Sequence, residues 1–133
     1  MVREDGFWIR SALAVYITGF GIGAFNHARD FLAWGWRPYN WGPPLLEVFW
    51  TSLFVMDVAV VALIARGWRR PALSLAAGIM ITDVGVNTFA WRILHIDAFA
   101  TAVPLQTAFL GFVLGSMPFL WNARASPAHR RMK

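Results

Sequence analysis

Four long apolar stretches alternate with short segments that are polar or contain proline. With a window of about 19 residues, they predict membrane-spanning helices at about residues 8–26, 45–65, 72–93 and 98–121. Pro43 and Pro44 precede the second helix and Pro71 precedes the third, close to first turns, where a missing N–H costs least. The pattern predicts an all-α fold, a single transmembrane bundle of four helices followed by a short basic cytoplasmic tail at 122–133.

The composition also indicates a membrane protein with one domain. Of the 133 residues, 58% are hydrophobic and 14% are charged, whereas soluble domains carry about 25% charged residues. The net charge of +5 comes from basic clusters between the apolar stretches and at the chain end, which is typical of membrane orientation rather than of nucleic-acid binding. The chain has no cysteine, which excludes disulfides and thiolate chemistry.

Basic residues are distributed unequally between the two sides of the predicted bundle. Because four spans return the chain to its starting side, the N-terminus, the second connection and the C-terminus share one face. That face holds nine of the twelve basic residues, namely Arg3, Arg10, Arg66, Arg69, Arg70, Arg124, Arg130, Arg131 and Lys133. By the positive-inside rule, we expect a multi-pass protein of a bacterial inner membrane with both termini in the cytoplasm.

Two aspartates interrupt the apolar pattern at the same predicted depth. At about 1.5 Å per helical residue, Asp57 and Asp83 both fall within a few ångströms of the membrane midplane. Each would cost about 2.5–3.5 kcal/mol at the centre of a lone helix, so both are expected to face the bundle interior. If they are adjacent, they cannot both ionise easily, and we expect at least one of them to hold a proton at neutral pH.

Further polar and aromatic residues lie in the outer half of the predicted bundle, on the non-cytoplasmic side. Asn87 and Trp91 follow Asp83 at one-turn spacing on the third helix. The other candidate ligand-binding residues are Glu47, Trp50 and Phe54 on the second helix, His27 and Asp30 on the first, and Gln106 on the fourth. This pattern predicts a pocket, open outward or sideways into the outer leaflet, that binds a small hydrophobic or cationic molecule.

Two histidines near the predicted outer face raise the question of a metal or haem site. His27 and His95 match no specific motif in their spacing, so neither a metal nor another cofactor is predicted. His27 is instead a candidate for proton transfer at the mouth of the pocket.

Glycines recur at four-residue spacing on the first and fourth predicted helices. Gly19 and Gly23 form one pair, and Gly111 and Gly115 form the other. Such spacing favours close helix packing, either within the chain or in a homodimer. The expected partners are membrane lipids and the small ligand, with either such a homodimer or a larger membrane complex as the assembly.

The chain has His27 and Asp30 at the end of the first predicted helix, Glu47 after the sequence PPLL, and the basic turn RGWRRPAL. This arrangement resembles the EXPERA-domain family of emopamil-binding sterol isomerases and their relatives. The resemblance implies a four-helix membrane fold that binds amphipathic amines or stabilises a carbocation. It also implies that Glu47 and Asp30 are the acids that face the ligand, whereas Asp57 and Asp83 have no family counterpart.

Three functional hypotheses follow, and the sequence alone does not decide whether the protein is an enzyme. In the first, Asp57 and Asp83 relocate a proton on the bound molecule, and Trp50 or Trp91 stabilises its positive charge. In the second, the midplane acids are the proton site of a proton-coupled carrier. In the third, the protein is an accessory or assembly subunit of a larger membrane complex, and its polar residues join helices.

Overall fold

The computed structural model describes residues 2–123, which form four α-helices. These are α1 (Val2–Trp34), α2 (Pro44–Ala65), α3 (Arg69–Arg92) and α4 (Phe99–Asn122). Each helix contains a stretch long and apolar enough to cross a membrane. Large apolar side chains also lie on the outside of these stretches, for example Ile22, Val55 and Leu105, as expected for surfaces in contact with lipid. The chain is an all-α, integral membrane four-helix bundle.

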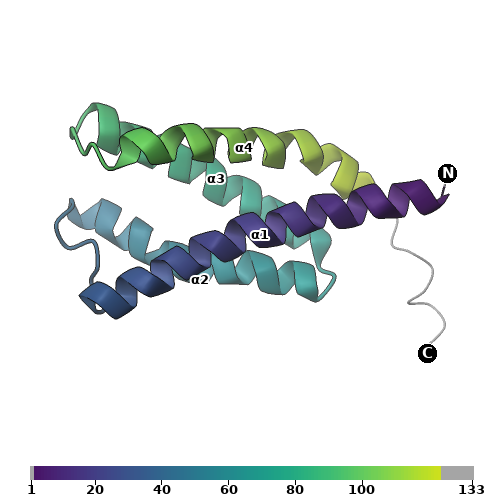
Figure 1. The fold of residues 1–133 in the computed structure, drawn as a ribbon, viewed down its shortest axis with the longest axis horizontal. Helices are drawn as coiled ribbons and strands as arrows, with labels where there is room; N and C mark the ends of the chain where they lie inside the picture. The colour runs from purple at the N-terminus through teal and green to yellow at the C-terminus, as the bar shows by residue number, and fades with distance from the viewer. Residues whose placement is uncertain (1, 124–133) are drawn as a thin grey trace.

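The four helices pair in two groups, α1 with α2 and α3 with α4, and α2 also packs against α3 (Figure 1). Contact between α1 and α4 is slight and is made by aromatic side chains, such as Phe20 against Phe109. The start of α1 and the end of α4 lie at the same end of the bundle as the α2–α3 turn, which we call the 66–68 end. The other two connections lie at the opposite end, called the 35–43 end.

The first helix continues past the expected end near residue 26 and reaches Trp34. The segment after Asn26 contains charged residues, but no glycine or proline interrupts it before Gly35. Gly35 has a φ of 78°, and its N–H donates to the carbonyl of Phe31, which ends the helix. The connection to α2 is therefore shorter than expected, and it places His27 and Asp30 on a rigid helix.

The other helices begin and end close to the predicted residues. α2 has Pro43 as its N-cap and begins with Pro44, whose missing N–H needs no partner there. α3 begins at Arg69 rather than at residue 72, because Pro71 lies in its first turn. α4 contains Pro104 and Pro118 without a break. The predicted tail at 122–133 lies outside the described residues from residue 124 onward.

The two ends of the bundle have different cores. Near the 66–68 end and the middle, the interior is filled by apolar side chains of all four helices, including Tyr16, Val60, Leu73 and Leu120. Towards the 35–43 end, the buried residues include Asp57, Asp83 and Asn87, together with Trp50. The polar residues therefore concentrate in one half of the bundle.

Candidate functional site

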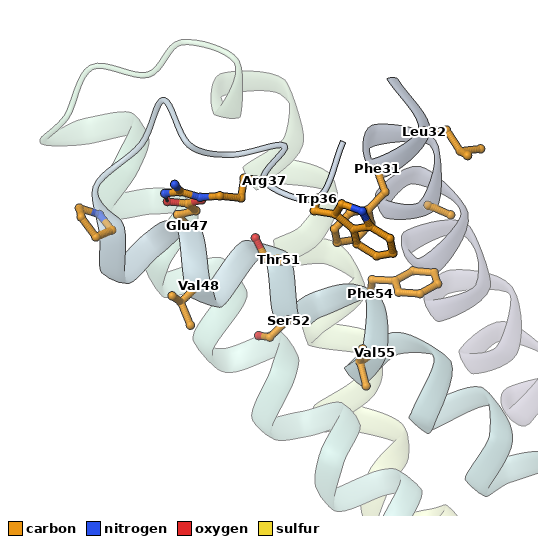
Figure 2. Close-up of a pocket in the computed structure, with 12 residues that line it drawn as sticks. Phe31, Leu32, Trp36, Arg37, Glu47, Val48, Thr51, Ser52, Phe54 and Val55 are labelled. Atoms are coloured by element: carbon orange, nitrogen blue, oxygen red, sulfur yellow. Dashed lines mark hydrogen bonds and ion pairs between the residues drawn. The ribbon is translucent and has the colours of Figure 1, made fainter. Parts of the chain in front are cut away.

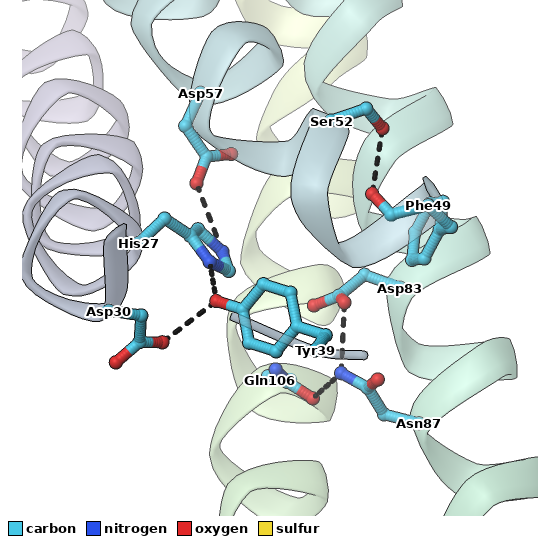
Figure 3. A network of polar contacts seen from close by, with 9 residues as sticks. All are labelled: His27, Asp30, Tyr39, Phe49, Ser52, Asp57, Asp83, Asn87 and Gln106. Atoms are coloured by element: carbon cyan, nitrogen blue, oxygen red, sulfur yellow. Dashed lines mark hydrogen bonds and ion pairs between the residues drawn. The ribbon is translucent and has the colours of Figure 1, made fainter. Parts of the chain in front are cut away.

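One polar chain connects the middle of the bundle with the 35–43 loop (Figure 3). The Oδ2 atom of Asp57 on α2 lies 4.0 Å from the Nε2 atom of His27 on α1. The Nδ1 atom of the same imidazole is 2.7 Å from the hydroxyl of Tyr39, which in turn donates a 2.7 Å hydrogen bond to Asp30. The chain thus reaches from an acid buried within α2 to an acid near the surface.

The hydrogen positions in this chain follow from the number of available donors. Tyr39 has one O–H, and Asp30 accepts it. The hydrogen between the imidazole and Tyr39 must then come from Nδ1 of His27, so a neutral His27 presents the lone pair of Nε2 to Asp57. Burial, followed by the hydrogen bond to Asp30 and its charge, raises the pKa of Tyr39 above its ordinary value, which keeps the hydroxyl protonated.

A glycine makes room for Asp57 beside α1. A Cβ atom added at Gly23 would overlap Oδ2 of Asp57, whereas one added at Gly21 would meet no atom within 4 Å. At Gly19, an added Cβ would meet the ring of Phe109. Gly19 and Gly23 therefore serve packing inside the chain. Gly111 and Gly115 have open space beside them, and a homodimer through that face stays a prediction.

A second cluster surrounds Asn87 and joins three helices. Its amide nitrogen donates to Oδ1 of Asp83, one turn away on α3, at 2.9 Å, and to Oε1 of Gln106 on α4 at 3.1 Å. Its amide oxygen accepts a 2.8 Å hydrogen bond from the indole N–H of Trp50 on α2. Both hydrogens of the Asn87 amide are used, so its orientation is fixed.

The two buried aspartates belong to separate clusters. Asp57 and Asp83 are only 5% and 7% exposed. The first faces His27 and the second is held by Asn87, and no hydrogen bond joins the two carboxyl groups among the described residues. Between residues 6 and 123, neither acid forms an ion pair with an arginine or lysine. Two buried carboxyl groups thus lie in one half of the bundle with a single imidazole as a potential counter-charge.

Glu47 has a different environment, because Arg37 of the 35–43 loop engages it fully. The two N–H···O contacts are 2.7 and 2.8 Å long, from Nε and Nη2 to the two carboxylate oxygens. Such a bidentate pair neutralises the carboxylate. Glu47 and Phe54 line a groove on the outside of α1 and α2 (Figure 2), whereas Asp57, Asp83 and Asn87 lie inside the bundle.

Both candidate tryptophans already have other groups packed against their rings. Trp50 stacks on Trp41 and Phe99, with ring centroids 5.4 and 5.3 Å apart, and meets Tyr39 edge-on. Trp91 already carries the guanidinium of Arg92, 4.2 Å from its ring centroid. The other candidate histidine, His95, lies exposed in the 93–98 connection.

Sequence reasoning missed Arg37 and Tyr39 as members of polar contacts. Both lie in the short connection after Gly35. The signal that could have found them is the number of unpaired acids nearby, since Asp30 and Glu47 both need donors at this end of the bundle.

Comparison with known proteins gave no match to a family model, to a curated protein or to a solved structure. The resemblance to the EXPERA-domain family therefore stays a prediction.

Proposed function

We propose that the protein binds a small hydrophobic or cationic molecule inside the membrane, at the acids Asp57 and Asp83, and exchanges a proton there. The observation that carries this proposal is the burial of both acids without a basic partner between residues 6 and 123, apart from His27. A buried carboxylate without a counter-ion is costly, so each acid needs either a proton or a bound cation.

The chain from Asp57 to Asp30 supplies a route for the exchanged proton. A proton on Asp57 faces the free lone pair of Nε2 of His27. When His27 accepts it, the imidazole can release the hydrogen on Nδ1 to the hydroxyl oxygen of Tyr39, which passes its own hydrogen to Asp30. In this step Asp57 loses one proton and Asp30 gains one, while His27 and Tyr39 each accept one and release one. The chain thus connects the buried acid with the 35–43 end.

The second acid supplies the other side of the proposed site. Asn87 occupies Oδ1 of Asp83 but leaves Oδ2 without a hydrogen bond among the described residues. Gln106 accepts from Asn87 through its oxygen, and its amide hydrogens remain available. Asp83 and Gln106 thus offer an acceptor and a donor to a ligand held near Asp57.

The location of the site follows from the proposed orientation. Nine of the twelve basic residues fall on the predicted cytoplasmic side, and by the positive-inside rule this favours an orientation with both termini in a bacterial cytoplasm. Asp30 and Tyr39 would then face the periplasm, and the acids would exchange protons with that side.

Binding is tested with tetraphenylphosphonium, a hydrophobic cation with a permanent charge. The full-length protein in detergent is expected to unfold at a higher temperature when this probe is added. The variants Asp57→Asn and Asp83→Asn replace a carboxyl group that can ionise by an amide of almost the same shape, and they should fold but lose most of the stabilisation. Asp97→Asn, which changes an exposed acid in the 93–98 connection, is the matched control. Equal stabilisation of all four proteins would refute the proposal.

A second candidate function is that of an assembly subunit whose polar residues hold helices in register. The full use of Asn87, with partners on α2, α3 and α4, favours it. Purification in mild detergent separates the two functions, since stoichiometric recovery with a large complex, without binding of the cation, would support the second.

A further inference from the structure

A groove of about 920 Å³ runs along the outside of α1 and α2, beside the 35–43 loop (Figure 2). Its walls include Phe31 and Leu32 of α1, Trp36 of the loop, and Val48, Phe54 and Val55 of α2. The volume is within the range of small-molecule sites, about 300–1,000 Å³. Since α1 and α2 are membrane-spanning helices, this groove opens towards the hydrocarbon of the bilayer.

The end of the groove at the 35–43 loop is polar, and the guanidinium of Arg37 forms its exposed side. The carboxylate of Glu47 is buried, whereas the side chain of Arg37 is 72% exposed. Glu47 holds the guanidinium through Nε and one N–H of Nη2, so the remaining N–H donors of Arg37 face outward in a fixed orientation. An anion at this end would meet an arginine that is already positioned to donate.

The two parts of the groove require two parts of one ligand. An apolar wall that faces hydrocarbon suits an acyl chain, and a fixed arginine at the depth where α2 begins suits a phosphate. A free anion would leave the apolar wall uncovered, and a chain without a head group would leave the N–H donors of Arg37 unused. A phospholipid of the adjacent leaflet satisfies both, and it is present wherever the protein is.

We propose that this groove binds one phospholipid, whose acyl chain lies along Phe31, Phe54 and Val55 and whose phosphate accepts hydrogen bonds from Arg37. The hydroxyl of Thr51 lies one helical turn from Glu47 within the groove and is placed to contact the ester region. This site lies outside the bundle and is independent of the proposed function of Asp57 and Asp83.

Native mass spectrometry of the full-length protein, with phosphatidylglycerol added to the delipidated sample, tests the proposal. The wild-type protein should retain one lipid. Arg37→Gln should weaken binding about tenfold or more, as expected for the loss of a charged hydrogen bond. Val55→Trp should fill the groove and weaken binding similarly while Arg37 stays in place.

Matched variants separate a specific site from general contact with lipid. Arg92→Gln removes another exposed arginine at the 35–43 end, and Val58→Trp enlarges an exposed residue of α2 that does not line the groove. Both should bind as the wild type does. A diacylglycerol, which lacks phosphate, should bind more weakly than phosphatidylglycerol, and glycerophosphate, which lacks acyl chains, should not bind.

The melting temperature of each variant shows whether it is folded. If Arg37→Gln does not fold because Glu47 loses its partner, Val55→Trp still decides the question. Wild-type affinity in folded Val55→Trp would overturn the proposal. Equal binding of diacylglycerol and phosphatidylglycerol would also overturn it, because the phosphate would then have no role.

Discussion

The two halves of this bundle are built from the same four helices but are held together by different interactions. Near the 66–68 end, apolar side chains such as Leu73, Val60 and Leu120 fill the interior. There, the buried hydroxyl of Tyr16 donates to the carbonyl of Val113 and also lies 3.2 Å from the hydroxyl of Ser116. Near the 35–43 end, buried acids and other polar side chains, joined by hydrogen bonds, fill much of the interior instead.

The difference suggests where to look for a role beyond packing. Apolar packing closes one half with few hydrogen bonds between side chains, so an extended polar network is not a general requirement of this fold. Asp57 and Asp83 must be retained against a cost that the apolar half avoids. The comparison therefore supports the proposal that the function lies in the polar half, and substitutions in the two halves should have effects of different kinds.

The largest effect on stability is expected in the apolar half. Leu73→Ala removes a side chain that is fully buried, and the resulting cavity should lower the free energy of unfolding by about 2–3 kcal/mol. Ile81→Ala, on an exposed position of the same helix, is the control and should change little. Both should keep the tetraphenylphosphonium response. Loss of that response in folded Leu73→Ala would contradict the division into two halves.

A bulkier residue at the boundary should disturb both halves. Gly23→Val places a Cβ on the Asp57 carboxylate, and the displacement should cost about 1–3 kcal/mol. Gly21→Val enters open space and should be tolerated. Thermal unfolding of the two variants measures the difference. Equal stability would show that Asp57 is not confined against α1.

In the polar half, removal of a hydrogen-bonding group should have a smaller effect on stability. Asn87→Leu keeps the approximate size of the side chain but removes its bonds to Trp50, Asp83 and Gln106. In membrane proteins each such bond contributes about 0.6 kcal/mol on average and about 1.7 kcal/mol at most. The loss of three bonds should therefore lower the free energy of unfolding by about 1–2 kcal/mol. Weaker cation binding should accompany it, because Asp83 is no longer oriented. Unchanged binding would assign Asn87 to helix packing alone.

The smallest effect is expected at the surface end of the polar chain. Tyr39→Phe removes the hydrogen bond to Asp30 and should cost about 1 kcal/mol. Because folding raises the pKa of Tyr39, the unfolded chain releases this proton above about pH 10 while the folded chain retains it. The contribution of Tyr39 is therefore complete below that pH and declines as the pH rises further. The melting temperature of the wild type should fall more steeply in this range than that of Tyr39→Phe.

Much of the fold was predictable, because the apolar stretches are long and their limits are marked by proline. The predicted limits of α2 and α4 agree with the structure to within a residue. The predicted end of α1, near residue 26, was wrong. Charged residues around His27 and Asp30 suggest a loop when their partners are unknown. No glycine or proline interrupts the helix before Gly35, and Tyr39 and Asp57 contact these residues from other elements.

The candidate site was predictable only where its residues share one helix. The pairing of Asp83 with Asn87 follows from their four-residue spacing. The contacts of His27 with Tyr39, of Glu47 with Arg37, and of Asn87 with Trp50 and Gln106 depend on how the helices and the loop pack. Helix periodicity carries no information about these contacts.

The most direct test of the central claim is the number of protons released when a cation binds. Tetraphenylphosphonium is added to the full-length protein in lightly buffered detergent with a pH indicator, and the release is compared with the amount of bound cation. If the cation replaces the proton that neutralises the buried acids, the wild type and Asp97→Asn should release about one proton per bound cation, whereas Asp57→Asn and Asp83→Asn should release much less. Binding without proton release in the wild type, or equal release in all four proteins, would contradict the assignment of Asp57 and Asp83 as a proton-exchanging site.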